Sequence, residues 1–163
     1  MNSFHADRLL RSRGPEPKLG MKWHKFLIYA SLWLSAANGF LNAVTYYNGT
    51  VYGADAAEVY VYYTGLSTLD KGMAIFCLAL GFYSVVTRFA LAKFKTNAPK
   101  LLLALFAINF ALNVLYLLLF SIITAIPLTG LLDASTLTTL LSNLALLIFN
   151  KSYYDARASL FIN

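Results

Sequence analysis

The sequence predicts an all-α fold, namely a membrane bundle of four transmembrane helices with a short extracytoplasmic helix at the membrane interface. Three observations predict this fold. The 163 residues are 59% apolar and only 12% charged, whereas soluble domains average about 45–50% apolar and about 25% charged. Long stretches without charged residues separate the charged segments. These stretches are solidly apolar and do not alternate, which favours helices over the strands of a barrel.

The uncharged stretches place the helices. Because a helix needs about 20 apolar residues to cross a bilayer, we expect helices over about 26–47, 71–93, 100–126 and 132–150. The last two come from one uncharged run, which is too long for a single crossing and is interrupted by Pro127. A turn at 127–130, followed by Asp133 or Ser135 as the N-cap residue, separates them.

The two ends of the chain are polar. Residues 1–21 are basic and are expected to be disordered, residues 22–150 form the transmembrane domain, and residues 151–163 form a cytoplasmic tail. The first apolar run, which begins near Phe26, is long enough to span a membrane. It is therefore interpreted as the first anchor and not as a cleaved signal peptide.

The basic residues predict the orientation. Twelve of the 13 Lys and Arg residues lie on one side of the predicted membrane, and only Lys71 lies on the other. An excess of Lys and Arg marks the cytoplasmic side. We therefore expect a multi-pass protein of the cell membrane with its N-terminus and C-terminus in the cytoplasm.

The loop between the first two spans, 48–69, is the largest predicted outer segment. Asp55 and Glu58 resemble a capping box, and Gly65 is suited to end a helix. They predict a short interfacial helix over 56–64. The alternation in Glu58–Tyr62 also fits a strand pair, but the helix is favoured.

Five asparagines lie in the predicted spans and form a candidate polar seam: Asn38, Asn42, Asn109, Asn113 and Asn143. Asn side chains hydrogen-bond between packed membrane helices, and they also carry the donors and acceptors that line a polar path. Both interpretations remain open, with packing favoured. No ionisable residue is expected at mid-membrane depth, which counts against a proton-driven transporter.

The sequence contains no motif for catalysis, a cofactor or a metal. His5 and His24 are far apart, and Cys77 is the single cysteine, expected to be a small buried apolar residue. We interpret His24, between Trp23 and Lys25, as part of an interfacial anchor. The protein is thus expected not to be an enzyme, and the basic residues form no nucleic-acid-binding module.

The basic residues beside the spans are candidate contacts for anionic lipids: Lys22, Lys25, Arg88, Lys93, Lys95 and Lys100. Each Lys or Arg near the surface contributes about 1 kcal/mol to such binding. The alternative is that they only set the topology. The expected partners are the bilayer and either a second copy or another membrane protein.

Short motifs recur in the two halves. Asn38 and Asn42 match Asn109 and Asn113 in spacing, and Arg88–Leu91 matches Arg157–Leu160 in its first and last residues. Two related helical hairpins would show this pattern. Short motifs also recur by chance, so a true repeat remains open.

Two segments, 83–101 (YSVVTRFALAKFKTNAPKL) and 150–163 (NKSYYDARASLFIN), resemble small uncharacterised bacterial four-helix membrane proteins. The resemblance implies a fold and a membrane location but no activity. Some members of that family carry a zinc ribbon ahead of the helices, and its cysteines are missing here. Two hypotheses follow: a non-enzymatic scaffold, sensor or complex subunit, and alternatively a small oligomeric channel or transporter for ions or small solutes.

Overall fold

The computed structural model describes residues 20–162, so the disorder predicted for residues 1–21 lies outside that range except at Gly20 and Met21. The described chain is helical and contains no strand, which confirms the all-α class. Its elements are α2 (Lys22–Phe26), the π-helix η1 (Leu27–Ser31), α3 (Leu32–Asn48), the 3-10 helix η2 (Thr50–Asp55), α4 (Ala56–Tyr62), α5 (Leu66–Ala92), α6 (Ala98–Thr124), α7 (Leu128–Leu131), α8 (Ala134–Asp155) and the 3-10 helix η3 (Ala158–Leu160).

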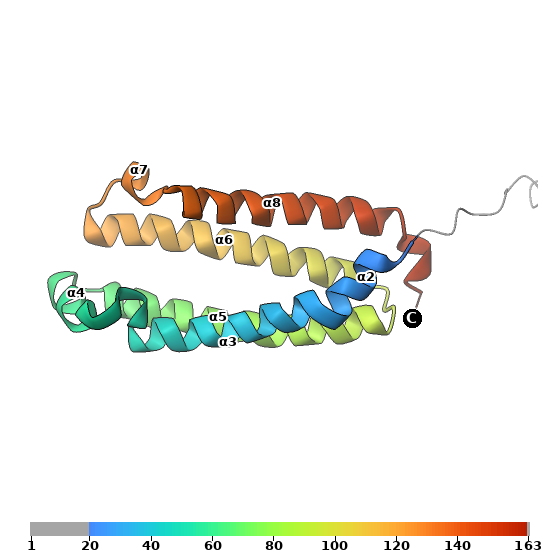
Figure 1. Cartoon of the computed structure of the whole chain (residues 1–163), viewed down its shortest axis with the longest axis horizontal. Coiled ribbons are helices and arrows are strands. Elements are labelled where there is room, and N and C mark those ends of the chain that lie inside the picture. The colour runs from blue at the N-terminus through green and yellow to red at the C-terminus, as the bar shows by residue number, and fades with distance from the viewer. Residues whose placement is uncertain (1–19, 163) are drawn as a thin grey trace, which may run out of the picture.

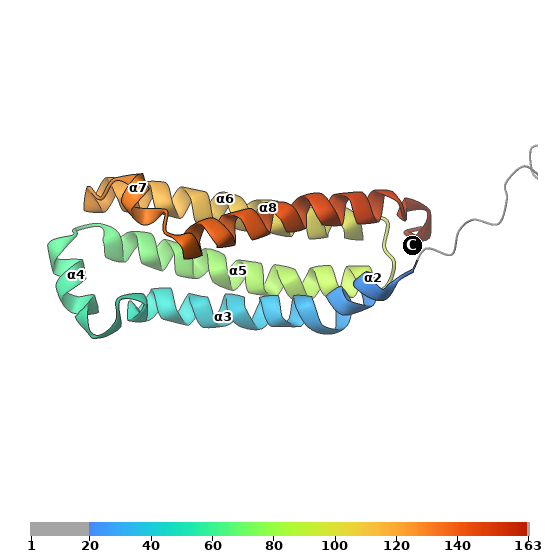
Figure 2. The ribbon, with the colours of Figure 1, turned by 45° about the horizontal axis from the view of Figure 1, so that its top comes forward.

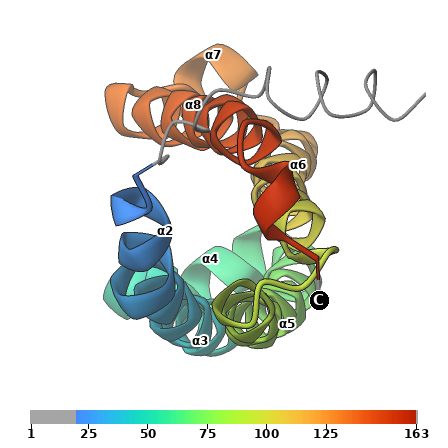
Figure 3. The ribbon, with the colours of Figure 1, turned by 90° about the vertical axis from the view of Figure 1, so that its right-hand side faces the viewer.

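The long helices run up and down beside one another, and α2, η1 and α3 form one continuous rod (Figures 1 and 2). The closest packing joins α3 to α5, α5 to α6, and α6 to α8. Viewed from the end, the helices are arranged around a common centre, with α2 between α3 and α8 (Figure 3). Close packing between α3 and α8 themselves is absent among the described residues.

Three helical segments of the described chain are long and apolar enough to cross a membrane: Lys22–Tyr62, α5 and α6. Their composition indicates membrane association, because so much apolar surface is stable only in lipid or in a protein interior. Polar residues dominate the first turns of α8, such as Thr136, Thr138 and Thr139. The fourth crossing therefore stays a prediction.

Two boundaries differ from expectation. The second long helix begins at Leu66, before the expected residue 71, because Gly65 (φ 101°) is the N-cap residue of α5 and does not end α4. A left-handed φ suits glycine, which has no Cβ to clash. The last helix continues past Asn150 to Asp155, so the expected tail at 151–163 begins as helix.

The outer loop is helical, as α4 shows, and the strand alternative is wrong. The capping box is also wrong, because the Asp55 side chain makes no hydrogen bond to the α4 backbone. The expected cap of α8 is confirmed. Oδ1 of Asp133 accepts a 2.7 Å hydrogen bond from the Thr136 amide, and this bond lowers the pKa of the Asp133 carboxyl.

Small residues allow α3 and α5 to approach closely. A Cβ on Gly39 would lie 3.0 Å from the Cys77 carbonyl oxygen and 3.0 Å from the Gly81 Cα atom. Cys77 is buried in this contact, as expected. Close approach of this kind is the usual way in which membrane helices pack tightly.

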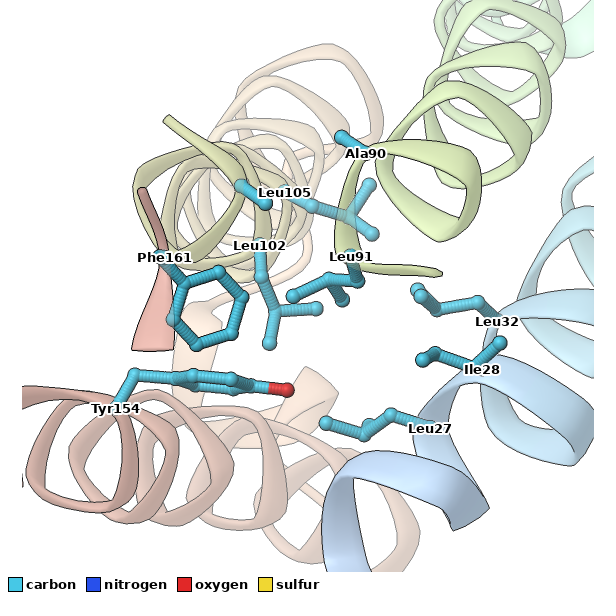
Figure 4. Packing of buried hydrophobic residues seen from close by; sticks show 10 residues of the cluster. Leu27, Ile28, Leu32, Ala90, Leu91, Leu102, Leu105, Tyr154 and Phe161 are labelled. Carbon is cyan, nitrogen blue, oxygen red and sulfur yellow. The ribbon is translucent and has the colours of Figure 1, made fainter. Parts of the chain in front are cut away.

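The apolar core gathers at one end of the bundle, which also carries Lys22, Lys25 and Lys95 and is called the basic end below. Leu27 and Leu32 meet Leu91 and Leu102 there, and Tyr154 and Phe161 from the C-terminal segment complete the cluster (Figure 4). The C-terminal segment therefore packs onto the bundle and does not extend away from it.

Candidate functional site

The predicted polar seam is partly assembled between α6 and α8. Nδ2 of Asn109 donates a 3.3 Å hydrogen bond to Oδ1 of Asn143. Nδ2 of Asn113 donates a 2.7 Å hydrogen bond to the Asn109 carbonyl oxygen, one turn earlier in the same helix. Three of the five seam residues therefore form one hydrogen-bonded group.

A cavity of about 110 Å³ brings the seam of α3 to that of α6. Four polar side chains and three apolar ones line it: Ser35, Asn38, Ser84, Asn109, Leu80, Leu105 and Phe106. A polar cavity of this volume has room for a few water molecules. Asn38 and Asn109 thus share one site, whereas Asn42, Asn113 and Asn143 do not line it.

Ser35, Asn38 and Asn42 form the α3 polar face. Their spacings of three and four residues place them on one side of α3. All three are exposed, and their side chains make no hydrogen bond within the described chain. Ser35 and Asn38 face the cavity that α3 shares with α5 and α6, so this face looks toward the inside of the bundle, although among the long helices α3 packs closely only against α5.

The opposite end of the bundle holds a buried carboxylate that the sequence did not reveal. Asp70 is fully buried in the second turn of α5. Its Oδ1 accepts a 2.8 Å hydrogen bond from the Tyr116 hydroxyl of α6, and its Oδ2 accepts a 3.0 Å bond from the Tyr60 hydroxyl of α4. The Tyr52 hydroxyl lies 3.3 Å from that of Tyr116.

Asp70 lies just outside the expected span of 71–93, whereas the structure places it within α5. A signal for its burial was present in the sequence. Asp70 is spaced by four, three, four and three residues along the stripe Asp70, Ala74, Cys77, Gly81 and Ser84, which faces the bundle along α5. Extending that stripe toward the N-terminus would have placed the carboxylate inside.

At the basic end, His24 faces the protein and not the membrane interface. It is 2% exposed, and its Nδ1 lies 2.9 Å from the Tyr154 hydroxyl. Its neighbour Trp23 donates a 2.9 Å hydrogen bond from Nε1 to Oδ1 of Asn150. These contacts join α2 to α8, and the interfacial anchor stays a prediction.

The expected lipid contacts separate into two kinds. Arg88 is half-buried and donates from Nε to the Ile28 carbonyl oxygen at 3.3 Å. The others have exposed side chains at the basic end: Lys22, Lys25, Lys93, Lys95 and Lys100.

Amide and hydroxyl groups such as those of the α3 polar face donate and accept hydrogen bonds without charge. They can bind polar groups of another helix or a small polar molecule. Within residues 20–162, no three His, Cys, Asp or Glu side chains gather closely enough to hold a metal ion. Comparison with known protein families, curated proteins and solved structures finds no match.

Proposed function

We propose that the protein is a non-enzymatic, multi-pass subunit of a membrane complex and that it associates with a second copy of itself through the α3 polar face. In this proposal α8 is the fourth crossing, α4 lies at the outer membrane interface, and both termini are cytoplasmic. The charge bias of twelve to one among Lys and Arg supports that orientation.

One observation carries the proposal. Ser35, Asn38 and Asn42 are exposed on a helical segment apolar and long enough to span a membrane. An amide without a hydrogen-bond partner in an apolar medium costs several kcal/mol on the strictest transfer scales, or about 1–3 kcal/mol from protein data. A partner that satisfies these amides therefore stabilises the bilayer-embedded protein.

A second copy suits this face chemically. Each Asn amide carries both donors and an acceptor, so two α3 helices related by a two-fold axis can satisfy each other's side chains. Such isologous contacts are the commonest in homo-oligomers. The α3 polar face lies beside the cavity toward α6, and α3 is not closely packed against α8. A second helix can therefore approach it between α3 and α8 without unpacking α5.

Energy transfer between two fluorescent proteins, fused to the N-termini of separate copies in vesicles, tests the proposal. We expect wild-type transfer to rise with the protein-to-lipid ratio. Replacing both Asn38 and Asn42 by Leu should weaken association about tenfold, because each membrane hydrogen bond contributes roughly 0.6 kcal/mol and several are lost.

Val44→Leu is the matched control, because Val44 is exposed on the other side of α3. It should leave association unchanged. The proposal would be overturned if energy transfer in the wild type did not exceed that expected from random collisions. Equal transfer in the wild type and the double Asn variant would also overturn it.

The cavity favours a second candidate function, a path for small polar solutes through an oligomer. Asn38 and Asn109 line it together. A liposome flux assay separates the two candidates: solute flux that falls in Asn109→Leu with helicity retained supports the path. Liposomes that stay impermeable to ions and small solutes exclude it.

A further inference from the structure

Arg88 lies near the end of α5 and is held in place by an irregularity of the neighbouring rod. In the π-helix η1, the Leu32 amide bonds to the Leu27 carbonyl, five residues earlier. In an α-helix that amide would bond to Ile28, four residues earlier. The Ile28 carbonyl, which the Leu32 amide does not use, accepts a 3.3 Å hydrogen bond from Nε of Arg88.

Two aromatic rings orient the rest of the guanidinium. Its central carbon lies 5.3 Å from the Trp33 ring centroid and 4.7 Å from the Phe89 ring centroid. Both distances fall within the range of cation–π attraction. With Nε bonded and two rings beside it, the side chain has little rotational freedom.

The outer edge of the guanidinium has no protein acceptor. The two terminal nitrogens of Arg88 make no hydrogen bond to the described residues, and the ion pair found among those residues is Lys151–Asp155, elsewhere on the chain. A guanidinium presents paired N–H groups that match phosphate oxygens. The missing partner is therefore an anion from outside this part of the chain.

We propose that the Arg88 guanidinium binds the phosphate of an anionic phospholipid, in a site formed by Arg88, Trp33 and Phe89 at the α3–α5 contact. Trp33 and Phe89 are 44% and 46% exposed. These surfaces suit acyl chains and glycerol, whereas a free phosphate would leave them uncovered. Lys22 and Lys25, on the same end of the bundle, add positive charge.

Native mass spectrometry of the intact chain tests the site, with phosphatidylglycerol and phosphatidylcholine as the competing probes. We expect wild-type protein to retain phosphatidylglycerol preferentially. Arg88→Gln should reduce that preference about five-fold, the effect of one charge near a lipid surface. Lys151→Gln is the control, because it removes one exposed charge from α8 at the same end and is not among the candidate lipid contacts, so it should keep the preference.

A second variant distinguishes loss of the lipid site from misfolding of the Arg88→Gln variant. Arg88→Lys keeps the charge but loses the planar guanidinium, so with helicity retained it should bind with intermediate preference. Equal losses in Arg88→Gln and Lys151→Gln would overturn the site in favour of diffuse charge attraction. Displacement of the lipid by millimolar inorganic phosphate, with no preference between the two lipids, would show a free-anion site and also overturn it.

Discussion

The Tyr116 hydroxyl donates a 2.8 Å hydrogen bond to Oδ1 of Asp70, so α6 and α5 are joined through a fully buried carboxylate at the end of the bundle opposite the basic end. The other carboxylate oxygen accepts from Tyr60 of α4. One side chain thereby connects three helices at the end opposite the apolar core. A charged or strongly polar group in such a place is stable only when its hydrogen bonds are satisfied.

Removing one of these donors should destabilise the fold. We expect Tyr116→Phe to lower the free energy of unfolding by about 1–3 kcal/mol, the cost of leaving a buried acceptor without its partner. Tyr62→Phe is the control, because the Tyr62 side chain is 79% exposed. Titration with a denaturing detergent measures both. Equal stability of the two variants would contradict a role for the Asp70 cluster.

The α3–α5 contact should tolerate no added methyl group at Gly39. The new Cβ would press against the backbone of α5 at 3.0 Å, so we expect Gly39→Ala to destabilise the protein by about 1–3 kcal/mol. Gly72→Ala places its Cβ in open space in the same helix pair, and it should stabilise α5 by up to about 1 kcal/mol. Unfolding midpoints that shift in the same direction would refute the prediction.

The C-terminal segment should contribute to the core at the basic end. Phe161 is 3% exposed and lies against Phe94, His24 and Tyr154. We expect Phe161→Ala to cost about 3 kcal/mol, as for buried aromatic residues, and to raise the rate of proteolysis after Asn150. Ile162→Ala, at an exposed neighbouring position, should leave both measurements unchanged. Equal proteolysis of the two variants would show that the segment does not hold the bundle.

The stabilisation of α8 by its N-cap residue, Asp133, should depend on pH. Since the Thr136 hydrogen bond lowers the pKa of Asp133 in the folded protein, its stabilisation is fully present above the ordinary carboxyl pKa and is lost as the pH falls through the lower folded value. We expect Asp133→Ala to speed amide hydrogen exchange in the first turn of α8 at neutral pH. Asp55→Ala is the control, because Asp55 makes no cap bond to α4. Unchanged exchange in Asp133→Ala would contradict the prediction.

Local patterns predicted the helices well but their ends poorly. Uncharged runs located α3, α5 and α6, and Asp133 was correctly expected to cap α8. The start of α5 was missed, because a glycine such as Gly65 is suited to either end of a helix. Only the folded chain shows that Gly65 precedes α5 and does not end α4. The prediction that Asp55 caps α4 was wrong for a related reason, since a side chain that is able to cap a helix does not have to do so.

The residues of the candidate site were predicted from the sequence, but the contacts between them were not. Helical spacing placed Asn38 and Asn42 on one face of α3 and Asn109 and Asn113 on one face of α6. It could not show that Asn109 bonds to Asn143 while Asn42 stays exposed. That difference depends on which helices are neighbours, and spacing within one helix contains no information about its neighbours.

The sequence by itself determined an all-helical chain with long apolar segments and a strongly biased distribution of Lys and Arg. These properties follow from the cost of exposing backbone and charge to lipid, which acts on each segment separately. Only the tertiary structure decided that Asp70 is enclosed by tyrosines, that Arg88 bonds to the Ile28 carbonyl in a π-helix, and that α3 packs closely against α5 and not against α8. Each of these depends on contacts between residues far apart in the chain, which form only when the helices pack.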